Sequence, residues 1–192
     1  MMRVALKQSY LQIIISLLLL LLFGISLITF WYQTKINTEI IITDDVATLA
    51  TIFKKINKAC TIIDFKYQQQ NYIDFLNVIS FKGSEIGTMN LKYPKKWRGP
   101  YLRDNPTVQG KHYQIVRTNQ GYFIAPGNGV KLKNGAVIGK DIILDMNADI
   151  FAMMKNPAQL NFQGKPLAVH LDLSQENSIV PIEPLGFETV NK

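Results

Sequence analysis

Two histidines and two aspartates are the residues that could carry out acid–base chemistry. The chain contains only His112 and His170, and Asp64 and Asp74 occur in two copies of Ile-Asp-Phe, ten residues apart. A hydrolase would need at least two of Asp64, Asp74 and His170 to converge on one pocket. Nothing near the aspartates in the sequence is typical of a catalytic carboxylate, so we interpret them as solvent-facing. We predict a non-catalytic protein without a cofactor, with an envelope hydrolase as the alternative.

Metal-binding patterns in the sequence are incomplete. Asp145, Asn147 and Asp149 match the first three ligand positions of a calcium loop, but Ile150 stands where its glycine belongs and Asn156 where its glutamate belongs. The histidine pair lacks a third ligand at a suggestive spacing. We therefore predict no metal site. We expect the acidic segment to form a polar turn that caps a short helix, and calcium binding there is the alternative.

Basic and aromatic residues alternate in the loop-rich stretch 81–106. They are Lys92, Lys95, Lys96, Arg98 and Arg103, interleaved with Tyr93, Trp97 and Tyr101. Such a stretch could bind lipid headgroups, a glycan or a partner protein. Alternatively it is a solvated loop whose tryptophan and tyrosines pack on the core. Our hypothesis is a partner surface made of Trp97, Arg98, Tyr101, Arg103, Lys95 and Lys96.

The longest apolar run, residues 13–31, contains no charge. Because about 20 apolar residues in a helix cross a bilayer core, it predicts a transmembrane signal-anchor helix over residues 9–34, after a cytoplasmic stub, residues 1–8. The run is longer than the core of a typical signal peptide, and no small-residue cleavage site follows it. A cleaved signal peptide and a buried core helix are the alternatives. The predicted anchor residues are Ile13, Leu17, Leu20, Phe23, Leu27 and Trp31.

The distribution of charge predicts the orientation. Arg3 and Lys7 precede the apolar run, and all 14 acidic residues follow it. The positive-inside rule then places the N-terminus in the cytoplasm and the domain of residues 35–173 outside. A single cysteine cannot form an internal disulfide, which favours a bacterial envelope protein over a small disulfide-bonded secreted module. We therefore expect a single-pass protein of the bacterial inner membrane with a periplasmic or extracellular domain.

An amphipathic helix is expected to open the outer domain. The β-branched residues 40–42 are typical of a short strand or an extended linker. Thr43, followed by Asp44 and Asp45, is typical of a helix N-terminus. Apolar residues then follow at spacings of three and four, which indicates a single buried stripe. They are Val46, Leu49, Phe53, Ile56 and Cys60. Because Cys60 completes this stripe, we interpret it as a core thiol.

The rest of the sequence predicts antiparallel β-structure. Segments 62–65 and 72–76 flank a polar turn and form either a hairpin or a strand followed by a helical turn. Segments 112–117 and 122–125 predict a hairpin, as do 130–133 and 136–138 around Asn134-Gly135. We also expect a strand at 142–144, a short helix at 147–154, a last strand at 167–173 and an extended tail over 174–192.

This order of elements resembles that of type IV pilin-like proteins. The stretch Trp97-Arg98-Gly99-Pro100-Tyr101-Leu102-Arg103-Asp104-Asn105-Pro106, with Tyr113 after it, is similar to the "GGYI..LP.DPWGN.Y.Y" segment of the major pseudopilin of type II secretion. In that family the aromatic and proline residues hold the loop that leads into the sheet, and the N-terminal helices stack into a short periplasmic pseudopilus. The resemblance implies an α+β, pilin-like fold.

Taken with the resemblance, the sequence predicts a pseudopilin-like component of a bacterial envelope or secretion assembly that acts by protein–protein interaction. Its expected partners are the lipid bilayer and other envelope or secretion proteins, and association with a second copy stays open. The excess of five basic residues after the stub is too small and dispersed to predict nucleic-acid binding. The alternative is a membrane-tethered module that binds peptidoglycan or another anionic envelope polymer.

Overall fold

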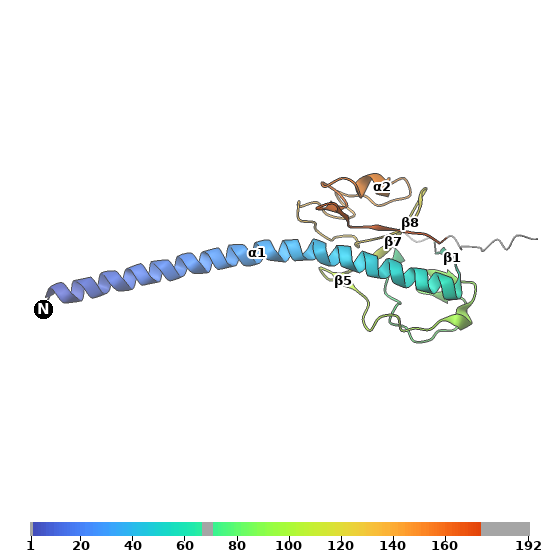
Figure 1. Cartoon of the computed structure of the whole chain (residues 1–192), viewed down its shortest axis with the longest axis horizontal. Coiled ribbons are helices and arrows are strands. Elements are labelled where there is room, and N and C mark those ends of the chain that lie inside the picture. The colour runs from blue at the N-terminus through green and yellow to red at the C-terminus, as the bar shows by residue number, and fades with distance from the viewer. Residues whose placement is uncertain (1, 67–70, 174–192) are drawn as a thin grey trace, which may run out of the picture.

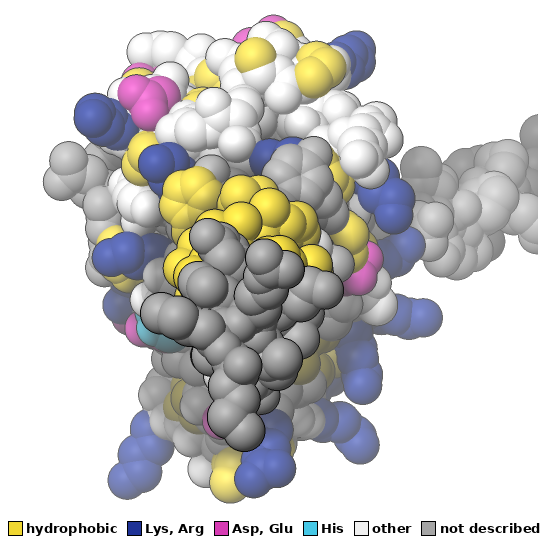
Figure 2. All heavy atoms as spheres, turned by 90° about the vertical axis from the view of Figure 1, so that its left-hand side faces the viewer, with side chains coloured by type: hydrophobic (Ala, Val, Ile, Leu, Met, Phe, Trp, Pro, Cys, Tyr) yellow, Lys and Arg dark blue, Asp and Glu magenta, His cyan; other side chains and the backbone are white. Residues whose placement is uncertain are grey.

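A single long helix organises the chain in the computed structural model, which describes residues 2–66 and 71–173. The helix α1 (Met2–Cys60) has 59 residues and is therefore about 90 Å long. Its N-terminal half projects away from the rest of the chain, and its C-terminal half runs along an α+β domain (Figure 1). Viewed from the N-terminal side, apolar side chains of the projecting half form a continuous patch (Figure 2).

The helix α1 is continuous where the sequence predicts a strand or linker and a new helix start at Thr43, so that prediction is wrong. Ile42 is fully buried, and the Thr43 hydroxyl donates to the Glu39 carbonyl four residues earlier (2.9 Å) rather than capping a helix. Asp45 accepts a hydrogen bond from the Tyr113 hydroxyl (2.7 Å). β-Branched residues lower helix stability by only about 0.5 kcal/mol each. Burial of Ile42 outweighs that cost.

The predicted apolar stripe on α1 is confirmed. Its members Val46, Leu49, Phe53, Ile56 and Cys60 are all at most 2 % exposed. Cys60 is a core thiol, as predicted, and burial raises its pKa. The Phe53 ring contacts the rings of Phe65 and Phe75, with centroids 6.1 and 6.2 Å away. The stripe is therefore the spine of the domain core.

Short antiparallel strands cover the packed half of α1. The four-stranded sheet has the order β11-β8-β7-β2, with β11 (Val169–Leu171), β8 (Gly121–Ala125), β7 (Gln114–Thr118) and β2 (Asn71–Tyr72). The three-stranded sheet has the order β1-β4-β3, with β1 (Ile62–Phe65), β4 (Met89–Leu91) and β3 (Glu85–Ile86). Two hairpins join β5 (Thr107–Val108) to β6 (Lys111–His112) and β9 (Asn161–Phe162) to β10 (Lys165–Pro166).

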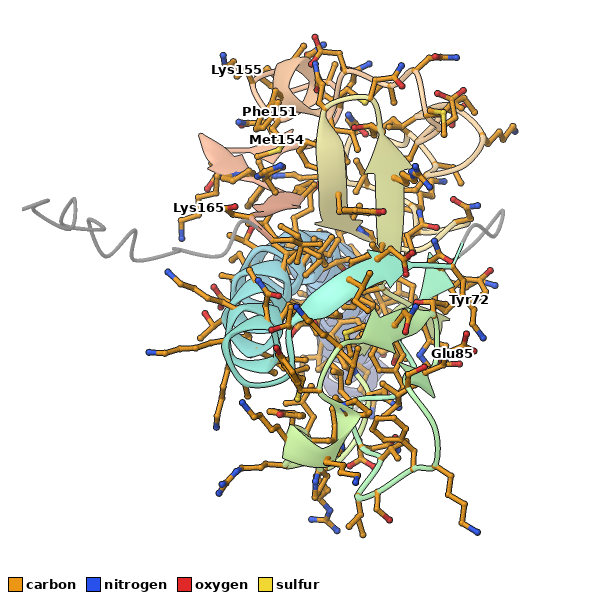
Figure 3. The ribbon with its side chains drawn as sticks, turned by 90° about the vertical axis from the view of Figure 1, so that its right-hand side faces the viewer. Tyr72, Glu85, Phe151, Met154, Lys155 and Lys165 are labelled. Carbon is orange, nitrogen blue, oxygen red and sulfur yellow. The ribbon has the colours of Figure 1, made fainter. Side chains whose placement is uncertain are left out.

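Two short helices complete the described domain, η1 (Pro94–Lys96) and α2 (Ile150–Met153). The four-stranded sheet lies between α1 and α2 (Figure 1), and Phe123 of β8 contacts Phe151 of α2 with ring centroids 5.0 Å apart. Seen from the end at which α1 stops, called here the distal end, the strands of this sheet stand beside the helix (Figure 3). The fold is therefore α+β with antiparallel sheets, as the sequence predicts.

The two copies of Ile-Asp-Phe do not form the predicted hairpin, nor a strand followed by a helical turn. The first copy lies in β1, which pairs with β4, whereas the second copy lies in the loop after β2, which pairs with β7. Residues 68–70 of the predicted turn lie outside the described residues. The repeat instead brings Phe65 and Phe75 to the same helix residue, Phe53. Both strands pair with segments later in the chain, which a local pattern cannot show.

The other predicted elements are confirmed in part. The hairpin after residue 112 forms as β7–β8, although His112 itself belongs to β6. The chain turns at Asn134-Gly135, and backbone hydrogen bonds join the two arms, from the N–H of Leu132 to the Ala136 carbonyl (2.8 Å) and from the N–H of Ile138 to the Val130 carbonyl (2.9 Å), although the arms form an isolated bridge rather than full strands. The stretch 81–106 contains β3, β4 and η1, which the sequence did not predict. The helix predicted at 147–154 is the shorter α2, the last strand is β11, and the segment 142–144 contributes a single bridge. The predicted tail, 174–192, lies outside the described residues.

Candidate functional site: a bare apolar helix and a basic distal surface

The segment Gln12–Trp31 of α1 is long and apolar enough to cross a membrane, judged by length and composition. Every predicted anchor residue is more than half exposed: Ile13, Leu17, Leu20, Phe23, Leu27 and Trp31. A helix that is apolar on all sides requires an apolar surrounding, either a protein core or a bilayer. No part of the described domain covers this segment, so α1 carries a candidate membrane span.

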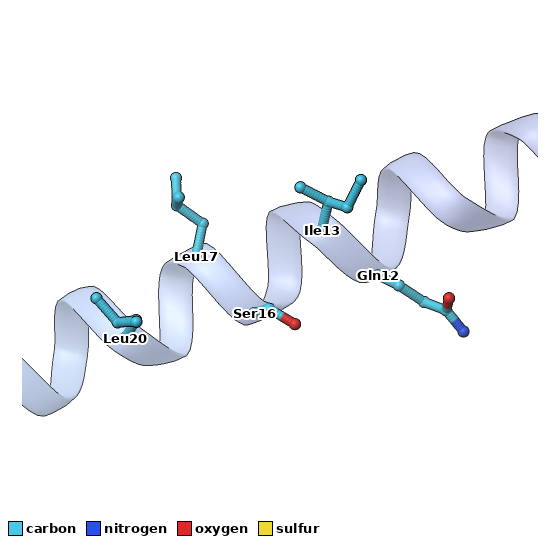
Figure 4. A pocket seen from close by; sticks show the side chains of 5 residues that line it. All are labelled: Gln12, Ile13, Ser16, Leu17 and Leu20. Carbon is cyan, nitrogen blue, oxygen red and sulfur yellow. The ribbon is translucent and has the colours of Figure 1, made fainter.

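A shallow hollow lies on the surface of this segment. One helix alone forms it, from Gln12, Ile13, Ser16, Leu17 and Leu20. The side chains point outward and no other element faces them (Figure 4). The hollow is therefore part of the outer surface of the helix rather than a ligand cavity.

The distal end of the domain is fixed around the last turn of α1. Thr61 has a φ of 53° and its N–H donates to the Asn57 carbonyl (2.9 Å), which ends the helix. Asn57 is 7 % exposed, and its side-chain amide donates to the Leu173 carbonyl (3.3 Å). The Cys60 carbonyl accepts a hydrogen bond from the N–H of Tyr93 (2.8 Å). These bonds hold the end of β11 and the loop before η1 against the helix.

The aromatic members of the predicted partner surface pack inward. Trp97 is half-buried, and its indole N–H donates to the Val78 carbonyl (3.1 Å). Its ring contacts Phe81 and Tyr101, with centroids 5.5 and 4.8 Å away. Burial raises the pKa of Tyr101, against a hydrogen bond from the backbone of Arg98 that lowers it. Trp97 and Tyr101 thus hold the loop to the domain, as the solvated-loop interpretation expects.

A second strap fixes the same loop. The side-chain amide of Asn105 accepts from the N–H of Leu76 (2.9 Å) and donates to the carbonyl of Asp74 (2.6 Å). The N–H groups of Tyr101 and Leu102 both donate to the Leu76 carbonyl. The stretch that follows η1 is therefore tied to the segment after β2 by both backbone and side chains.

The basic members of the predicted partner surface are exposed, and the fold adds others to them. Lys54, Lys55 and Lys58 project from the last turns of α1, and η1 packs against α1. The sequence presents these three only as favourable charges near a helix C-terminus, because nothing in it shows that η1 lies beside them. We define the basic distal surface as Lys54, Lys55, Lys58, Lys92, Lys95, Lys96 and Arg98. Arg103 is exposed too and lies 4.0 Å from Asp104.

The basic distal surface contains as many basic residues as the domain has in excess of acidic ones. Residues 35–173 contain 18 basic and 11 acidic residues, and the excess of seven equals the number of basic residues on this surface. Segments 51–61 and 92–98, which carry it, contain no acidic residue. Two ion pairs of the described residues, Lys66 with Glu85 (2.6 Å) and Arg103 with Asp104, lie outside this surface. The segments that form it therefore supply no carboxylate to offset its field.

The position of this surface rules out one of the three ligand classes considered for the basic stretch. Lys54 and Cys60 lie 23 and 29 residues beyond Trp31 on one helix, a rise of roughly 35–45 Å. The headgroup layer on one side of a bilayer is only about 5–8 Å thick. The surface therefore cannot reach the headgroups of a membrane that α1 crosses, which leaves a glycan or a partner protein.

The candidate acid–base residues come from three different segments of the fold. Asp64 lies in β1, Asp74 in the loop after β2, and His170 in β11 with the rings of Phe123 and Phe151 beside it (5.0 and 5.4 Å). A groove at the distal end, between the last turns of α1 and β11, is lined by His170 but by neither aspartate. The described residues contain no group of three His, Cys, Asp or Glu side chains that could hold a metal ion. The lining of that groove therefore does not pair His170 with either aspartate.

The calcium-like segment forms a polar turn. The Asp145 carboxylate accepts from the N–H of Asn147 (2.9 Å). The Asp149 carboxylate caps α2 by accepting from the N–H of Ala152 (3.0 Å) and also accepts from the Gln120 amide (3.2 Å). The bond from Ala152, followed by that from Gln120, lowers the pKa of Asp149. Both carboxylates thus serve local backbone groups, which is the structural role predicted for them.

Comparisons of the chain with protein-family models, with curated proteins and with solved structures found no match. The functional argument therefore rests on two features of the molecule, the bare half of α1 and the basic distal surface. They lie at opposite ends of the chain's long axis (Figure 1).

Proposed function

We propose that this protein is a single-pass, non-catalytic, pseudopilin-like subunit of a bacterial envelope or secretion assembly that acts through protein–protein contacts. One observation carries the proposal: a single uninterrupted helix is both the exposed apolar segment and the spine of the domain. A rod of this kind would hold the domain at a fixed distance from the bilayer. Its bare flanks would be free to pack against other membrane helices, including those of further copies.

The segment that resembles the pseudopilin loop supports the proposal. Trp97 and Asn105 tie the loop to the segment after β2, and Tyr113, which is fully buried, bonds to Asp45 on α1. The resemblance implies a loop held by its aromatic residues before the sheet begins. The contacts of this loop are of that kind.

The proposed orientation has the N-terminus in the cytoplasm and the domain on the periplasmic or extracellular side. It is tested with a Lys140→Cys variant, because Lys140 is exposed on the domain whereas the native Cys60 is fully buried. In intact cells with a permeabilised outer envelope, a membrane-impermeant maleimide should label the variant and leave the native chain unlabelled. Labelling only after the inner membrane is broken would reverse the orientation.

Assembly is tested by disulfide crosslinking in native membranes. Leu17→Cys, Leu22→Cys and Leu27→Cys, which follow one another at five-residue spacing, place thiols around the bare half, and Lys140→Cys is the matched control on the domain. We expect defined crosslinked species for at least one helix position and none for the control. If oxidant yields only monomer at all three helix positions, the helix does not pack against a neighbour and the assembly role fails.

The basic distal surface also favours a second candidate, a membrane-tethered module for peptidoglycan or another anionic envelope polymer. This function predicts that the purified protein pellets with the polymer at low salt and is released as salt increases. An assembly subunit without polymer binding would stay in the supernatant at both salt concentrations. Crosslinking at the bare half distinguishes the two functions independently of this result.

A further inference from the structure

A groove of about 820 Å³ opens beside the basic distal surface. One wall is the last turns of α1, the second is β11 and the residues after it, and the third is the loop at η1. Lys54 and Lys58 stand on the helix wall and Lys96 on the loop wall, all exposed or partly exposed. Asp172 is the one acidic residue of the lining. The groove is therefore biased toward an anionic occupant.

The strand wall of the groove is the edge of a sheet. β11 is the outermost strand of the order β11-β8-β7-β2, and among the described residues it pairs with β8 alone. The carbonyl of Leu173, just after β11, accepts from the Asn57 side chain on α1. This carbonyl thus faces the helix at the end of the groove. An edge strand of this kind is the main-chain template to which extended peptides add.

The aromatic ring at the groove is less suited to a sugar. The Lys92 and Lys96 ammonium groups lie over the Tyr93 ring, 5.5 and 4.8 Å from its centroid. A glycan that stacked on Tyr93 would have to displace them, and it would supply no amide groups at the spacing of a strand. A peptide can use the sheet edge and the lysines together.

We propose that this groove binds an acidic protein segment in extended conformation, with its backbone paired to β11 and its carboxylates at Lys54, Lys58 and Lys96. The inference deepens the proposed function, since it names the chemistry of a partner for the distal end. It does not depend on packing of the bare helix. The site can therefore be tested on the isolated full-length protein.

The probe is a fluorescent ten-residue peptide of alternating Glu and Val, titrated onto the full-length protein in detergent at 150 mM salt. The first comparison is the same peptide with all its peptide nitrogens methylated, which keeps all charges but removes the donors for strand pairing at both edges. The second is polygalacturonate, which carries carboxylates on a sugar backbone. We expect the unmethylated peptide to bind at least tenfold more tightly than either.

Charge-reversal variants test the lysines. Lys54→Glu, Lys58→Glu and Lys96→Glu together should weaken peptide binding at least tenfold, because three favourable surface pairs become unfavourable ones. The matched control, Lys111→Glu, Lys140→Glu and Lys165→Glu, makes the same change in net charge at exposed sites outside the groove. We expect the control to change the affinity less than threefold. A far-UV melt of each variant verifies that it is folded.

Four results would overturn the proposal. Equal binding of the methylated peptide, or of polygalacturonate, would mean that the surface attracts any polyanion. Equal loss in the control variant would mean that only net charge matters. A tenfold gain on removal of residues 174–192, which contain Glu176, Glu183 and Glu188, would mean that the groove is filled by this chain itself. If the triple variant does not fold, the comparison of the two peptides on the native protein still decides.

Discussion

The two halves of α1 belong to one helix but meet different surroundings. In the projecting half, Leu20 and Ile28 are 74 % and 73 % exposed, whereas in the packed half Phe53 and Ile56 are fully buried. The projecting half is apolar on every side, and the packed half has a single apolar stripe with lysines and acids elsewhere. The backbone is the same in both. The arrangement of side chains alone decides whether a helix suits lipid or a protein core.

The surroundings change although no break in the helix separates the two halves. The helix runs through residues 32–38 without interruption, and the first described side chain buried in the domain is Glu39. Whatever tilts the projecting half must therefore tilt the domain as well. Substitutions can disrupt either half, and we expect the effects to decrease from the projecting half, through Phe53 and the distal loop, to Glu39.

Charge in the projecting half should have the largest effect. Leu20→Arg with Phe23→Arg places two cations near the centre of the apolar segment, which disfavours membrane insertion by roughly 5–7 kcal/mol in total. We expect the carbonate-resistant membrane fraction to fall to near background. Thr48→Arg with Thr51→Arg, which has the same spacing on the exposed face of the packed half, is the control and should leave that fraction unchanged. Equal loss in both variants would contradict the assignment.

A cavity in the packed half should have the next largest effect. Phe53→Ala removes a fully buried ring that contacts Phe65 and Phe75, and should lower the free energy of unfolding by about 3–5 kcal/mol. Denaturant unfolding in detergent measures it, with the exposed Thr51→Ala as the control, expected within about 0.5 kcal/mol. Membrane association should not change. A loss below about 1 kcal/mol would mean that Phe53 is not part of the spine.

The distal loop should respond less, and its two neighbours should respond differently. Trp97→Ala breaks the bond to Val78 and two ring contacts, so we expect a loss of about 2 kcal/mol in the free energy of unfolding. Arg98→Ala should stay within about 0.5 kcal/mol, because Arg98 is exposed. If Trp97→Ala leaves stability unchanged but abolishes partner binding, Trp97 contacts the partner and does not stabilise the fold.

Glu39, where the two halves meet, should give the smallest effect, seen as a pH dependence. The residue is 3 % exposed, its carboxylate accepts from the N–H of Lys133 (2.8 Å), and desolvation raises its pKa above 4.5 despite that bond. Because the folded-state pKa is raised, the protein is favoured where the carboxyl is protonated. It loses stability as the pH rises from about 4.5 through the folded-state value.

The Glu39→Gln variant isolates this contribution. It keeps an acceptor for the Lys133 N–H but cannot ionise. We expect the difference in unfolding free energy between the variant and the native chain to grow in the variant's favour as the pH increases through that window. A difference that is constant between about pH 4 and pH 7 would show that Glu39 is not desolvated in the fold.

Much of the helix could be predicted from the sequence, and much of the distal end could not. The stripe from Val46 to Cys60 and the apolar segment are periodic signals that one helix carries by itself. The continuity at Thr43 was missed because its N-cap pattern is overridden by the burial of Ile42, a tertiary contact. The basic distal surface was predicted only in part for the same reason. Lys54 and Lys96 are 42 residues apart in sequence, and only the fold brings them to one groove.

The most direct test of the account is the distance between the two halves of α1. Spin labels at Ile28→Cys and Thr51→Cys, both exposed, are 23 residues apart, which is about 35 Å on a continuous helix. In nanodiscs, a double electron–electron resonance measurement should give one narrow distribution near that value. Ile41→Pro, at an exposed position, is the control and should broaden it. A broad or much shorter distribution in the native sequence would mean a linker at residues 35–42 and would contradict the single rigid rod.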